Sequence, residues 1–199
     1  MPYSSSNGKQ YTIDLINRIN PKTVLDIGAG SGTYAAYKKQ GQHWSAIEIW
    51  QPNIDKFNLT SLYDKVICGD ARNIDFGVYD LVILGDVLEH MSKHEAQDLL
   101  DRCRKSKYVI VSIPLGHYPQ EEYEGNPYEK HVTDNWSSEE FIQTFGKPWK
   151  EHQENEIGVF VYRNLKICVY AISKNEKQFV KRFCDSAKDA DLILIADTR

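Results

Sequence analysis

Carboxylates stand at the ends of successive apolar segments, a placement that predicts a ligand site. Asp26 lies near the end of the apolar run 24–27, Glu48 near the end of 43–49, and Asp70 just after 65–68. In folds with parallel strands, ligands bind at the carboxyl ends of the strands. Glu48 follows a glycine-rich turn by roughly twenty residues, the position from which a carboxylate accepts hydrogen bonds from both hydroxyls of a ribose. A solvated strand end is the alternative interpretation of Glu48.

The turn has the sequence Ile27-Gly28-Ala29-Gly30-Ser31-Gly32. Because glycine carries no Cβ, the backbone turns sharply here and can approach a ligand closely. Dinucleotide-binding turns have the spacing G-x-G-x-x-G, in which the helix aims its N-terminus at a pyrophosphate. The G-x-G-x-G spacing of this chain favours a ligand without a pyrophosphate. Taken alone, the turn also fits a tight strand-to-helix connection or an NAD site.

Four motifs in chain order resemble those of class I S-adenosylmethionine-dependent methyltransferases, of the small-molecule, type 11-like group. They are V-L-D-I-G-A-G-S-G at 24–32, the acidic end of 43–49, G-D-A at 69–71 and Y-D-L-V-I-L-G-D-V-L-E-H at 79–90. The resemblance implies that S-adenosylmethionine is the cofactor and that Asp70 contacts its adenine amino group. It assigns the cofactor site to Asp26, Gly28, Ala29, Gly30, Gly32, Glu48, Ile49, Asp70, Ala71, Asp86 and Val87.

A long polar segment, residues 117–131, is expected to hold the acceptor site, because it leaves a strand at the carboxyl edge of the sheet. A sulfonium is a strong electrophile, so the protein must chiefly hold the acceptor in line with the methyl group. An acceptor hydroxyl also needs a base, and histidine suits this role because its pKa lies near neutrality. The candidate catalytic residues are His131, His117 and His90. The alternative is that His131 anchors the segment, together with Trp136, and that the Glu89–His90 pair is structural.

Alternating strands and helices must position these residues. The apolar patterns predict parallel strands at 24–27, 43–49, 65–68, 79–84 and 108–113, with helices at 12–19, 52–59, 92–105 and 137–145. Ser92 and Glu95 form a capping-box pattern. A closing hairpin is expected from 151–156 and 159–163, around Ile157-Gly158. The expected fold class is α/β, a Rossmann-like seven-stranded, mostly parallel doubly wound sheet with a C-terminal antiparallel hairpin.

Residues 165–199 exceed what that core needs. Strands are expected at 165–172 and 191–198, with a helix at 178–187 between them. The turn S-K-N-E at 173–176 and the run A-D-T at 196–198 resemble the opening of GT-A-type glycosyltransferases, but the metal-binding D-x-D of that family is missing. The expected domains are therefore 1–164, a methyltransferase domain, and 165–199, a β-α-β fragment that cannot transfer sugars by itself. The alternative is a last methyltransferase strand with an appended helix and strand.

Composition excludes several classes of function. The net charge of −4 disfavours duplex nucleic acid as a partner. The four cysteines show no C-x-x-C spacing, so neither a metal site nor a disulfide framework is expected. No apolar run reaches the ~20 residues of a membrane span, and the polar start lacks a signal-peptide core, so a cytoplasmic protein without membrane contact is expected. The motifs of DNA-base methyltransferases, N-P-P-Y or D-P-P-Y and Pro-Cys, are missing after 79–84 and 108–113.

The sequence therefore predicts an enzyme that transfers a methyl group from S-adenosylmethionine to a small molecule or a glycan, by O-methylation. The prediction of a glycan as the acceptor rests on the glycosyltransferase-like segment 165–199, because domains joined in one chain often serve one pathway. The alternatives are a catalytically inactive module that binds S-adenosylmethionine or acts as a scaffold, and an NAD-binding Rossmann domain. The sequence leaves the oligomeric state and the acceptor atom open.

Overall fold

The structure of the chain is a computed structural model that describes residues 5–164, 167–174, 177–188, 190 and 192–197. Contacts between residues divide the chain into two compact units, Met1–Asn164 and Leu165–Arg199. The first unit contains the glycine-rich turn and every predicted site residue, so the candidate site belongs to it alone.

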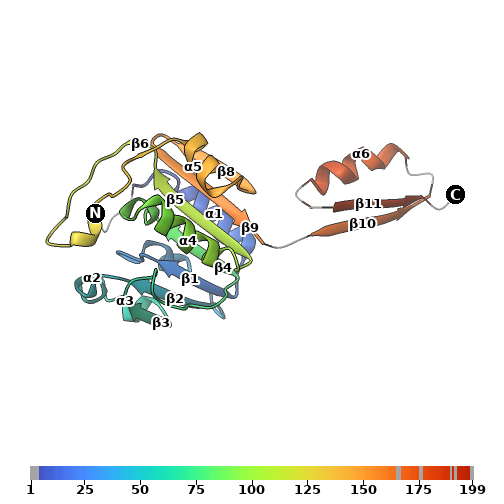
Figure 1. Ribbon diagram of the computed structural model, residues 1–199. Coiled ribbons are helices and arrows are strands. Elements are labelled where there is room, and N and C mark those ends of the chain that lie inside the picture. The colour runs from blue at the N-terminus through green and yellow to red at the C-terminus, as the bar shows by residue number, and fades with distance from the viewer. Residues whose placement is uncertain (1–4, 165–166, 175–176, 189, 191, 198–199) are drawn as a thin grey trace. The chain divides into compact units, whose positions relative to one another are not determined.

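Seven strands form one sheet in the first unit, in the order β3-β2-β1-β4-β5-β9-β8 (Figure 1). The first five strands along the chain pair in parallel, β9 runs antiparallel to β5, and β8 runs antiparallel to β9. This arrangement confirms the predicted fold class. The strands are β1 (Thr23–Ile27), β2 (His43–Glu48), β3 (Lys65–Cys68), β4 (Leu81–Gly85), β5 (Tyr108–Pro114), β8 (Lys150–Glu154) and β9 (Ile157–Arg163).

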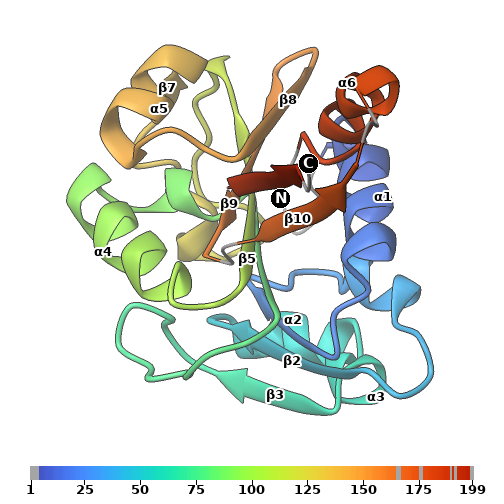
Figure 2. The same cartoon turned by 90° about the vertical axis from the view of Figure 1, so that its right-hand side faces the viewer.

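Helices cover both faces of the sheet (Figure 2). Successive side chains of a strand point to opposite faces, and β4 shows the consequence. Val82 packs in one buried cluster with Leu99 of α4, whereas Leu81 packs in the other with Ile16 of α1. The helices are α1 (Lys9–Ile19), α2 (Gln51–Lys56), α3 (Leu59–Leu62), α4 (Lys93–Cys103) and α5 (Ser138–Phe145).

Serine side chains begin two of these helices. Ser92 Oγ accepts a hydrogen bond from the Glu95 amide, and the Ser92 amide donates to Glu95 Oε2 at 3.0 Å, which confirms the predicted capping box. Ser137 Oγ accepts from the Glu140 amide at 3.0 Å. The predicted helices 92–105 and 137–145 therefore begin where the local chemistry favours a start.

Two predicted boundaries were wrong, and an asparagine lies at each. The helix predicted at 52–59 is interrupted at Asn58, whose φ of 48° is left-handed, so α2 and α3 are separate. The hairpin predicted around Ile157-Gly158 turns earlier, at Asn155, with a φ of 52°. Asparagine enters this region more readily than most residues because its side chain bonds locally. Gly158 lies within β9, where the Phe160 ring fills the space of its missing Cβ.

Short elements surround the carboxyl edge of the sheet. Three are 3-10 helices, and two are strands of two residues each that pair antiparallel with each other. They bound the glycine-rich turn and the long segment after β5. They are η1 (Thr33–Tyr37), η2 (Leu88–His90), η3 (Pro127–Glu129), β6 (Gly116–His117) and β7 (Asn135–Trp136).

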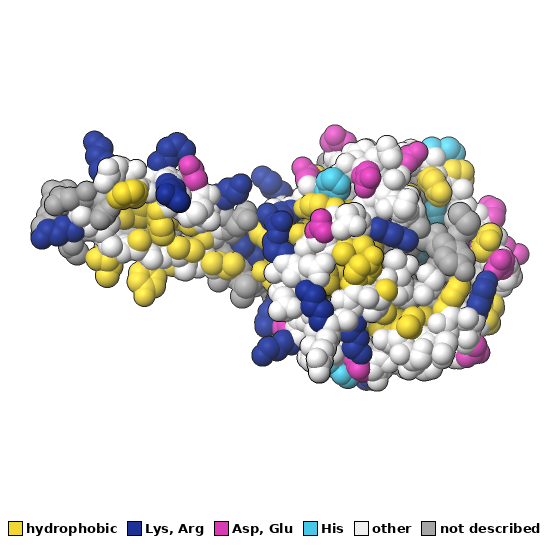
Figure 3. Space-filling view, turned by 180° about the vertical axis from the view of Figure 1, so that it is seen from behind, with side chains coloured by type: hydrophobic (Ala, Val, Ile, Leu, Met, Phe, Trp, Pro, Cys, Tyr) yellow, Lys and Arg dark blue, Asp and Glu magenta, His cyan; other side chains and the backbone are white. Residues whose placement is uncertain are grey.

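The second unit is a β-α-β arrangement. Strands β10 (Cys168–Ser173) and β11 (Leu192–Asp197) pair in parallel, with α6 (Lys177–Ser186) between them in sequence. Apolar side chains are exposed on this unit (Figure 3), among them Tyr170 and Ile172. Eight residues of the predicted fragment 165–199 lie outside the described residues, namely 165, 166, 175, 176, 189, 191, 198 and 199. Within the described part of the chain, no helix has the length and apolar character needed to cross a membrane.

The separation of the two units generates a prediction about truncation. A chain ending at Asn164 keeps the whole seven-stranded sheet and the helices on both faces. We expect it to unfold in one transition, with a free energy of unfolding unchanged within about 0.5 kcal/mol, the usual effect of changes far from a core. Urea denaturation of both chains, followed by circular dichroism, measures this. Loss of the folded signal in the truncated chain would contradict the boundary.

Candidate functional site

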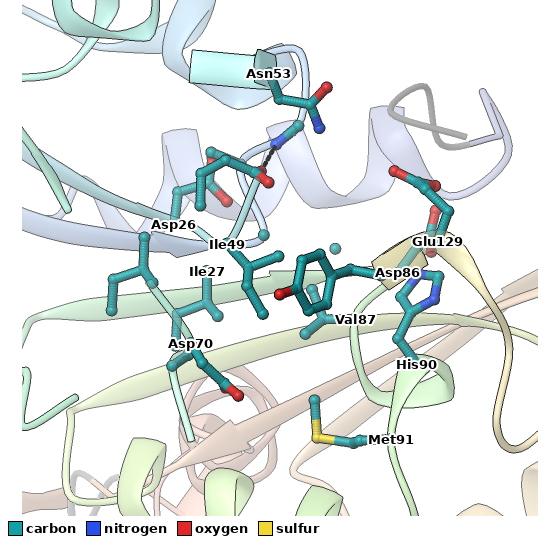
Figure 4. A pocket seen from close by; sticks show the side chains of 18 of the residues that line it. Asp26, Ile27, Ile49, Asn53, Asp70, Asp86, Val87, His90, Met91 and Glu129 are labelled. Carbon is teal, nitrogen blue, oxygen red and sulfur yellow. Dashed lines mark hydrogen bonds between the residues drawn. The ribbon is translucent and has the colours of Figure 1, made fainter. Parts of the chain in front are cut away.

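A cavity of about 270 Å³ opens at the carboxyl edge of the parallel strands. Asp26 and Asp70 lie on one side of it, and His90, Met91 and Glu129 lie on the other (Figure 4). Ten of the eleven residues predicted for the cofactor line this cavity, and Gly32 does not. The ten are Asp26, Gly28, Ala29, Gly30, Glu48, Ile49, Asp70, Ala71, Asp86 and Val87.

The glycine-rich turn is held by backbone geometry that side chains would oppose. Gly28 has a φ of 70° and donates its amide to the Ile47 carbonyl at 2.8 Å. A Cβ on Gly28 would lie 2.6 Å from Cγ2 of Val87, which itself lines the cavity. A Cβ on Gly32 would lie 2.7 Å from the Leu62 side chain. Gly28 therefore keeps the cavity open, while Gly32 allows α3 to pack against the turn.

The carboxylate of Glu48 bridges two loops at the edge of the cavity. Its Oε2 accepts from the Gly30 amide at 2.9 Å, and its Oε1 accepts from the Trp50 amide at 3.0 Å. Burial raises the pKa of Glu48, against the lowering effect of these hydrogen bonds. Each carboxylate oxygen can accept a further hydrogen bond. Glu48 can therefore hold both loops and still accept hydrogen bonds from a ligand hydroxyl.

Asp26 is a buried acid at the end of β1. Its Oδ2 accepts from the Tyr63 hydroxyl at 2.5 Å. Burial raises the pKa of Asp26 to about 7, even though the hydrogen bond from Tyr63 lowers it. Desolvation disfavours the charged form of a carboxyl group. Near neutral pH the side chain is thus divided between its neutral and ionised forms, and a cationic ligand in the cavity would favour the ionised form.

Asp70 is engaged by a neighbouring arginine. The Arg72 guanidinium donates to both carboxylate oxygens, at 2.7 Å to 3.0 Å, and also to Glu95. This hydrogen bonding lowers the pKa of Asp70, so the carboxylate is ionised. A contact with an adenine amino group, predicted from the resemblance, has to share these oxygens with Arg72.

The far side of the cavity is formed after β4. Asp86 has a φ of 55°, and its Oδ1 accepts from the Ser112 hydroxyl at 3.0 Å. Burial raises its pKa. Three residues on, Glu89 is 1% exposed, and neither of its carboxylate oxygens has a hydrogen-bond partner elsewhere in the described chain. His90 follows it and lines the cavity.

The structure brings two of the three candidate catalytic histidines together. The rings of His90 and His131 have centroids 5.0 Å apart, and burial lowers the pKa of both, to about 4 for His90. Both rings are therefore neutral near pH 7. His117 lies on β6 with its side chain 72% exposed, 3.9 Å from Asp134, and does not line the cavity. Trp136 is buried against Phe141 and Phe145, as an anchor of the segment would be.

Several residues that line the cavity or support its lining were missed in the sequence. Tyr128 and Glu129 reach the cavity from η3, inside the long segment that was expected to hold the acceptor. Asn53 lines the cavity beside Glu48, whose pKa it lowers by a hydrogen bond. Tyr63 bonds to Asp26 across 37 residues of sequence, and no local pattern indicates that contact.

The acidity of Asp26 generates a prediction about pH dependence. Its folded-state pKa is raised, so its contribution to stability is fully present below about pH 4 and is lost as the pH rises through about 7. Between pH 5 and pH 8 we expect the ligand-free protein to lose about 3 kcal/mol more stability than Asp26→Asn, because stability falls by about 1.4 kcal/mol per pH unit from pH 5 to the folded-state pKa of about 7 and levels off above it.

Urea unfolding of both proteins at pH 5 and pH 8 measures this difference. Asp55→Asn is the control, because Asp55 is exposed on α2 and its replacement leaves the loss of stability between these pH values unchanged. If the native protein and Asp26→Asn lose the same amount of stability between pH 5 and pH 8, Asp26 ionises in the folded state as it does in the unfolded chain.

Comparisons with known proteins agree with this geometry. Residues 24–106 match the family model described as "Methyltransferase domain". No curated protein matches the chain. Among solved structures, a proposed O-methyltransferase of Nostoc punctiforme PCC 73102 is 22% identical with a TM-score of 0.58, over 78% of this chain and 55% of that one. This chain thus spans about half the length of that relative.

Two further structures share the fold. The N-terminal domain of EvdMO1 with S-adenosylhomocysteine bound is 14% identical with a TM-score of 0.59, over 80% of this chain and 82% of that one. An S-adenosylmethionine-dependent methyltransferase of Clostridium acetobutylicum ATCC 824 is 14% identical with a TM-score of 0.58, over 77% of this chain and 89% of that one. The matched family domain contains the glycine-rich turn and the acidic strand ends that line the cavity. Residues 24–106 therefore resemble a methyltransferase domain, and the first unit has a fold that it shares with solved S-adenosylmethionine-dependent methyltransferases.

Proposed function

We propose that the chain methylates a hydroxyl oxygen of a small molecule or a glycan. The observation that carries this proposal is the pair of neutral histidines His90 and His131, of which His90 lines the cavity that also contains the predicted cofactor residues. A neutral imidazole can receive the proton that a hydroxyl must lose.

The cofactor would be held by the acidic strand ends. Glu48 would accept hydrogen bonds from the ribose hydroxyls, and Asp70 would accept one from the adenine amino group. Ionised Asp26 would lie near the positive charges of the methionine part. When bound, S-adenosylmethionine supplies an electrophilic methyl carbon, because its sulfur leaves with the electron pair of the carbon–sulfur bond. The remaining task of the protein is to place the acceptor oxygen in line with that bond and to exclude water.

The acceptor would enter between η2 and the segment that follows β5. Val132 and Thr133 donate their amides to the Glu89 carbonyl at 2.8 Å and 3.0 Å, so this segment is fixed to η2. Tyr128 lies near Trp50 with ring centroids 6.1 Å apart, and it is 45% exposed. Aromatic side chains that are partly exposed at a cavity mouth suit the apolar face of a phenol or a sugar ring.

Two observations support a sugar as the acceptor. EvdMO1, which shares the fold, has been crystallised in the presence of S-adenosylhomocysteine and D-fucose. The parallel β10 and β11 with α6 between them have the order expected for the opening of a nucleotide-sugar-binding domain. We propose on this basis that 1–164 is the methyltransferase domain and 165–199 a β-α-β fragment resembling the start of a glycosyltransferase domain, and that both serve glycan chemistry.

Glu48 tests the placement of the cofactor. We expect Glu48→Ala to weaken binding of S-adenosylhomocysteine roughly 10- to 150-fold, the equivalent of about 1.5–3 kcal/mol for hydrogen bonds to a charged group. Glu48 also holds the Gly30 amide, so the 2′-deoxy analogue separates the two roles. The native protein should bind this analogue more weakly than the parent compound, and Glu48→Ala should bind both equally.

Isothermal titration calorimetry gives these affinities, with Glu151→Ala on β8 as the control because its side chain is exposed and far along the sheet from β2. An unchanged affinity of Glu48→Ala for S-adenosylhomocysteine would remove Glu48 from the ribose site.

A methyl-transfer screen tests the acceptor. With S-adenosylmethionine carrying a deuterated methyl group, we expect mass-labelled methyl ethers from pools of sugars, nucleotide sugars and phenols, because the site offers neutral imidazoles for a hydroxyl proton. Gly28→Val is the inactive control, because its side chain would meet Val87 in a left-handed turn. Label found only on nitrogen or sulfur would contradict O-methylation. Cofactor binding with no labelled product would indicate an inactive binding module.

A further inference from the structure

A cluster of three ionisable side chains joins two distant parts of the chain. Glu89 and His90 belong to η2, and His131 comes from the segment between β6 and β7. One ligand atom of each of the three lies within 4.8 Å of the others. Ligand atoms of one zinc ion lie about 2 Å from the metal and therefore at most about 4 Å apart. Side-chain shifts of about 1 Å would bring the three atoms around one ion.

Both imidazoles are already oriented by backbone carbonyls. His90 Nδ1 lies 3.2 Å from the Lys130 carbonyl oxygen, and His131 Nδ1 lies 2.6 Å from that of Tyr118. A carbonyl oxygen only accepts hydrogen bonds, so each Nδ1 carries the ring proton and donates it. Each Nε2 is left with a lone pair. Histidines that bind metals show this pattern, in which the second ring nitrogen donates to a carbonyl or a carboxylate.

Glu89 supplies a second, independent observation that points to a ligand at this cluster. Its side chain is buried, and neither carboxylate oxygen has a hydrogen-bond partner on any other described residue. Buried polar groups are nearly always paired, and a buried carboxylate is costly unless it is paired or coordinates a metal. The carboxylate belongs to the same cluster as the two oriented imidazoles.

We propose that Glu89, His90 and His131 bind one divalent transition-metal ion, such as Mn²⁺, Fe²⁺, Co²⁺ or Zn²⁺. Imidazole together with carboxylate suits these ions better than Mg²⁺ or Ca²⁺, which prefer ligand sets of oxygen alone. The cysteine spacing predicted no metal site, and this cluster uses no cysteine.

The ion would border the cofactor cavity, because His90 lines that cavity. Three protein ligands leave coordination positions open, as catalytic metal sites do. A bound ion favours the deprotonated form of a coordinated hydroxyl. The role in catalysis, which rests on the proposed function, is therefore to hold the acceptor hydroxyl and ease loss of its proton to solvent. In the metal-bound chain His90 and His131 act as ligands, and the ion replaces the base role that these histidines have in the metal-free chain.

Metal binding is measured on the full chain without cofactor or acceptor. After removal of metals with a chelator and dialysis, Mn²⁺ is titrated, and the free ion is followed by electron paramagnetic resonance. Mn²⁺ is the probe because it has little preference for thiols, so the exposed Cys68 and Cys168 do not compete. We expect one ion per chain, and an at least tenfold weaker affinity in Glu89→Gln and in His131→Gln.

The control is His94→Gln on α4, whose side chain is 86% exposed and outside the cluster; its Mn²⁺ affinity should equal that of the native chain. Circular dichroism and binding of S-adenosylhomocysteine establish that each variant is folded. Co²⁺ provides a second readout, because histidine coordination in the native chain should give visible absorption bands that His131→Gln weakens.

Absence of stoichiometric Mn²⁺ binding to the native chain, or equal affinity in folded His131→Gln, would overturn the metal site. Metal binding without any methyl transfer would leave the site standing and refute the proposed function. Methyl transfer that persists unchanged after removal of metals, in a chain that binds no Mn²⁺, would refute the metal site and leave the proposed function standing.

Discussion

The Glu48 carboxylate holds together two loops that shape the cavity at the carboxyl edge of the sheet. One oxygen accepts from the Gly30 amide of the glycine-rich turn, and the other accepts from the Trp50 amide at the start of α2. These loops follow neighbouring parallel strands, and the Glu48 side chain at the end of β2 reaches both. Because the carboxylate is buried, each of these hydrogen bonds is made where water competes weakly. The width of the cavity between the two loops depends on this group.

Much of this architecture could be predicted because local chemistry determines it. The apolar strands, the glycine-rich turn and the Ser92 capping box each depend on residues that are close in sequence. The two wrong boundaries share another cause, because Asn58 and Asn155 adopt left-handed backbone that their residue type permits without requiring it. Asparagine in an otherwise helical or extended pattern therefore leaves the end of the element undetermined.

The side of the cavity formed by η2 and the segment after β5 could be predicted only in outline, because its contacts join distant segments. His131 was a candidate on the sequence, but its approach to His90 requires the carbonyls of Lys130 and Tyr118 to orient both rings. Glu89 reads as a helix-start residue in the motif, and only its burial without a hydrogen-bond partner in the described chain singles it out. Tertiary burial of this kind leaves no periodic signal.

The segment after β5 is anchored at its base and open at its tip. The two-residue strands β6 and β7 pair beneath it, Trp136 is buried below them, and η2 holds Val132 and Thr133. Glu121 and Glu124, by contrast, are exposed. Insertions and substitutions at such tips are tolerated because they disturb few buried contacts. If the proposed function holds, natural variation at 121–125 would change which acceptor is chosen while folding and cofactor affinity stay constant, and the same stretch is the natural place to graft a new specificity.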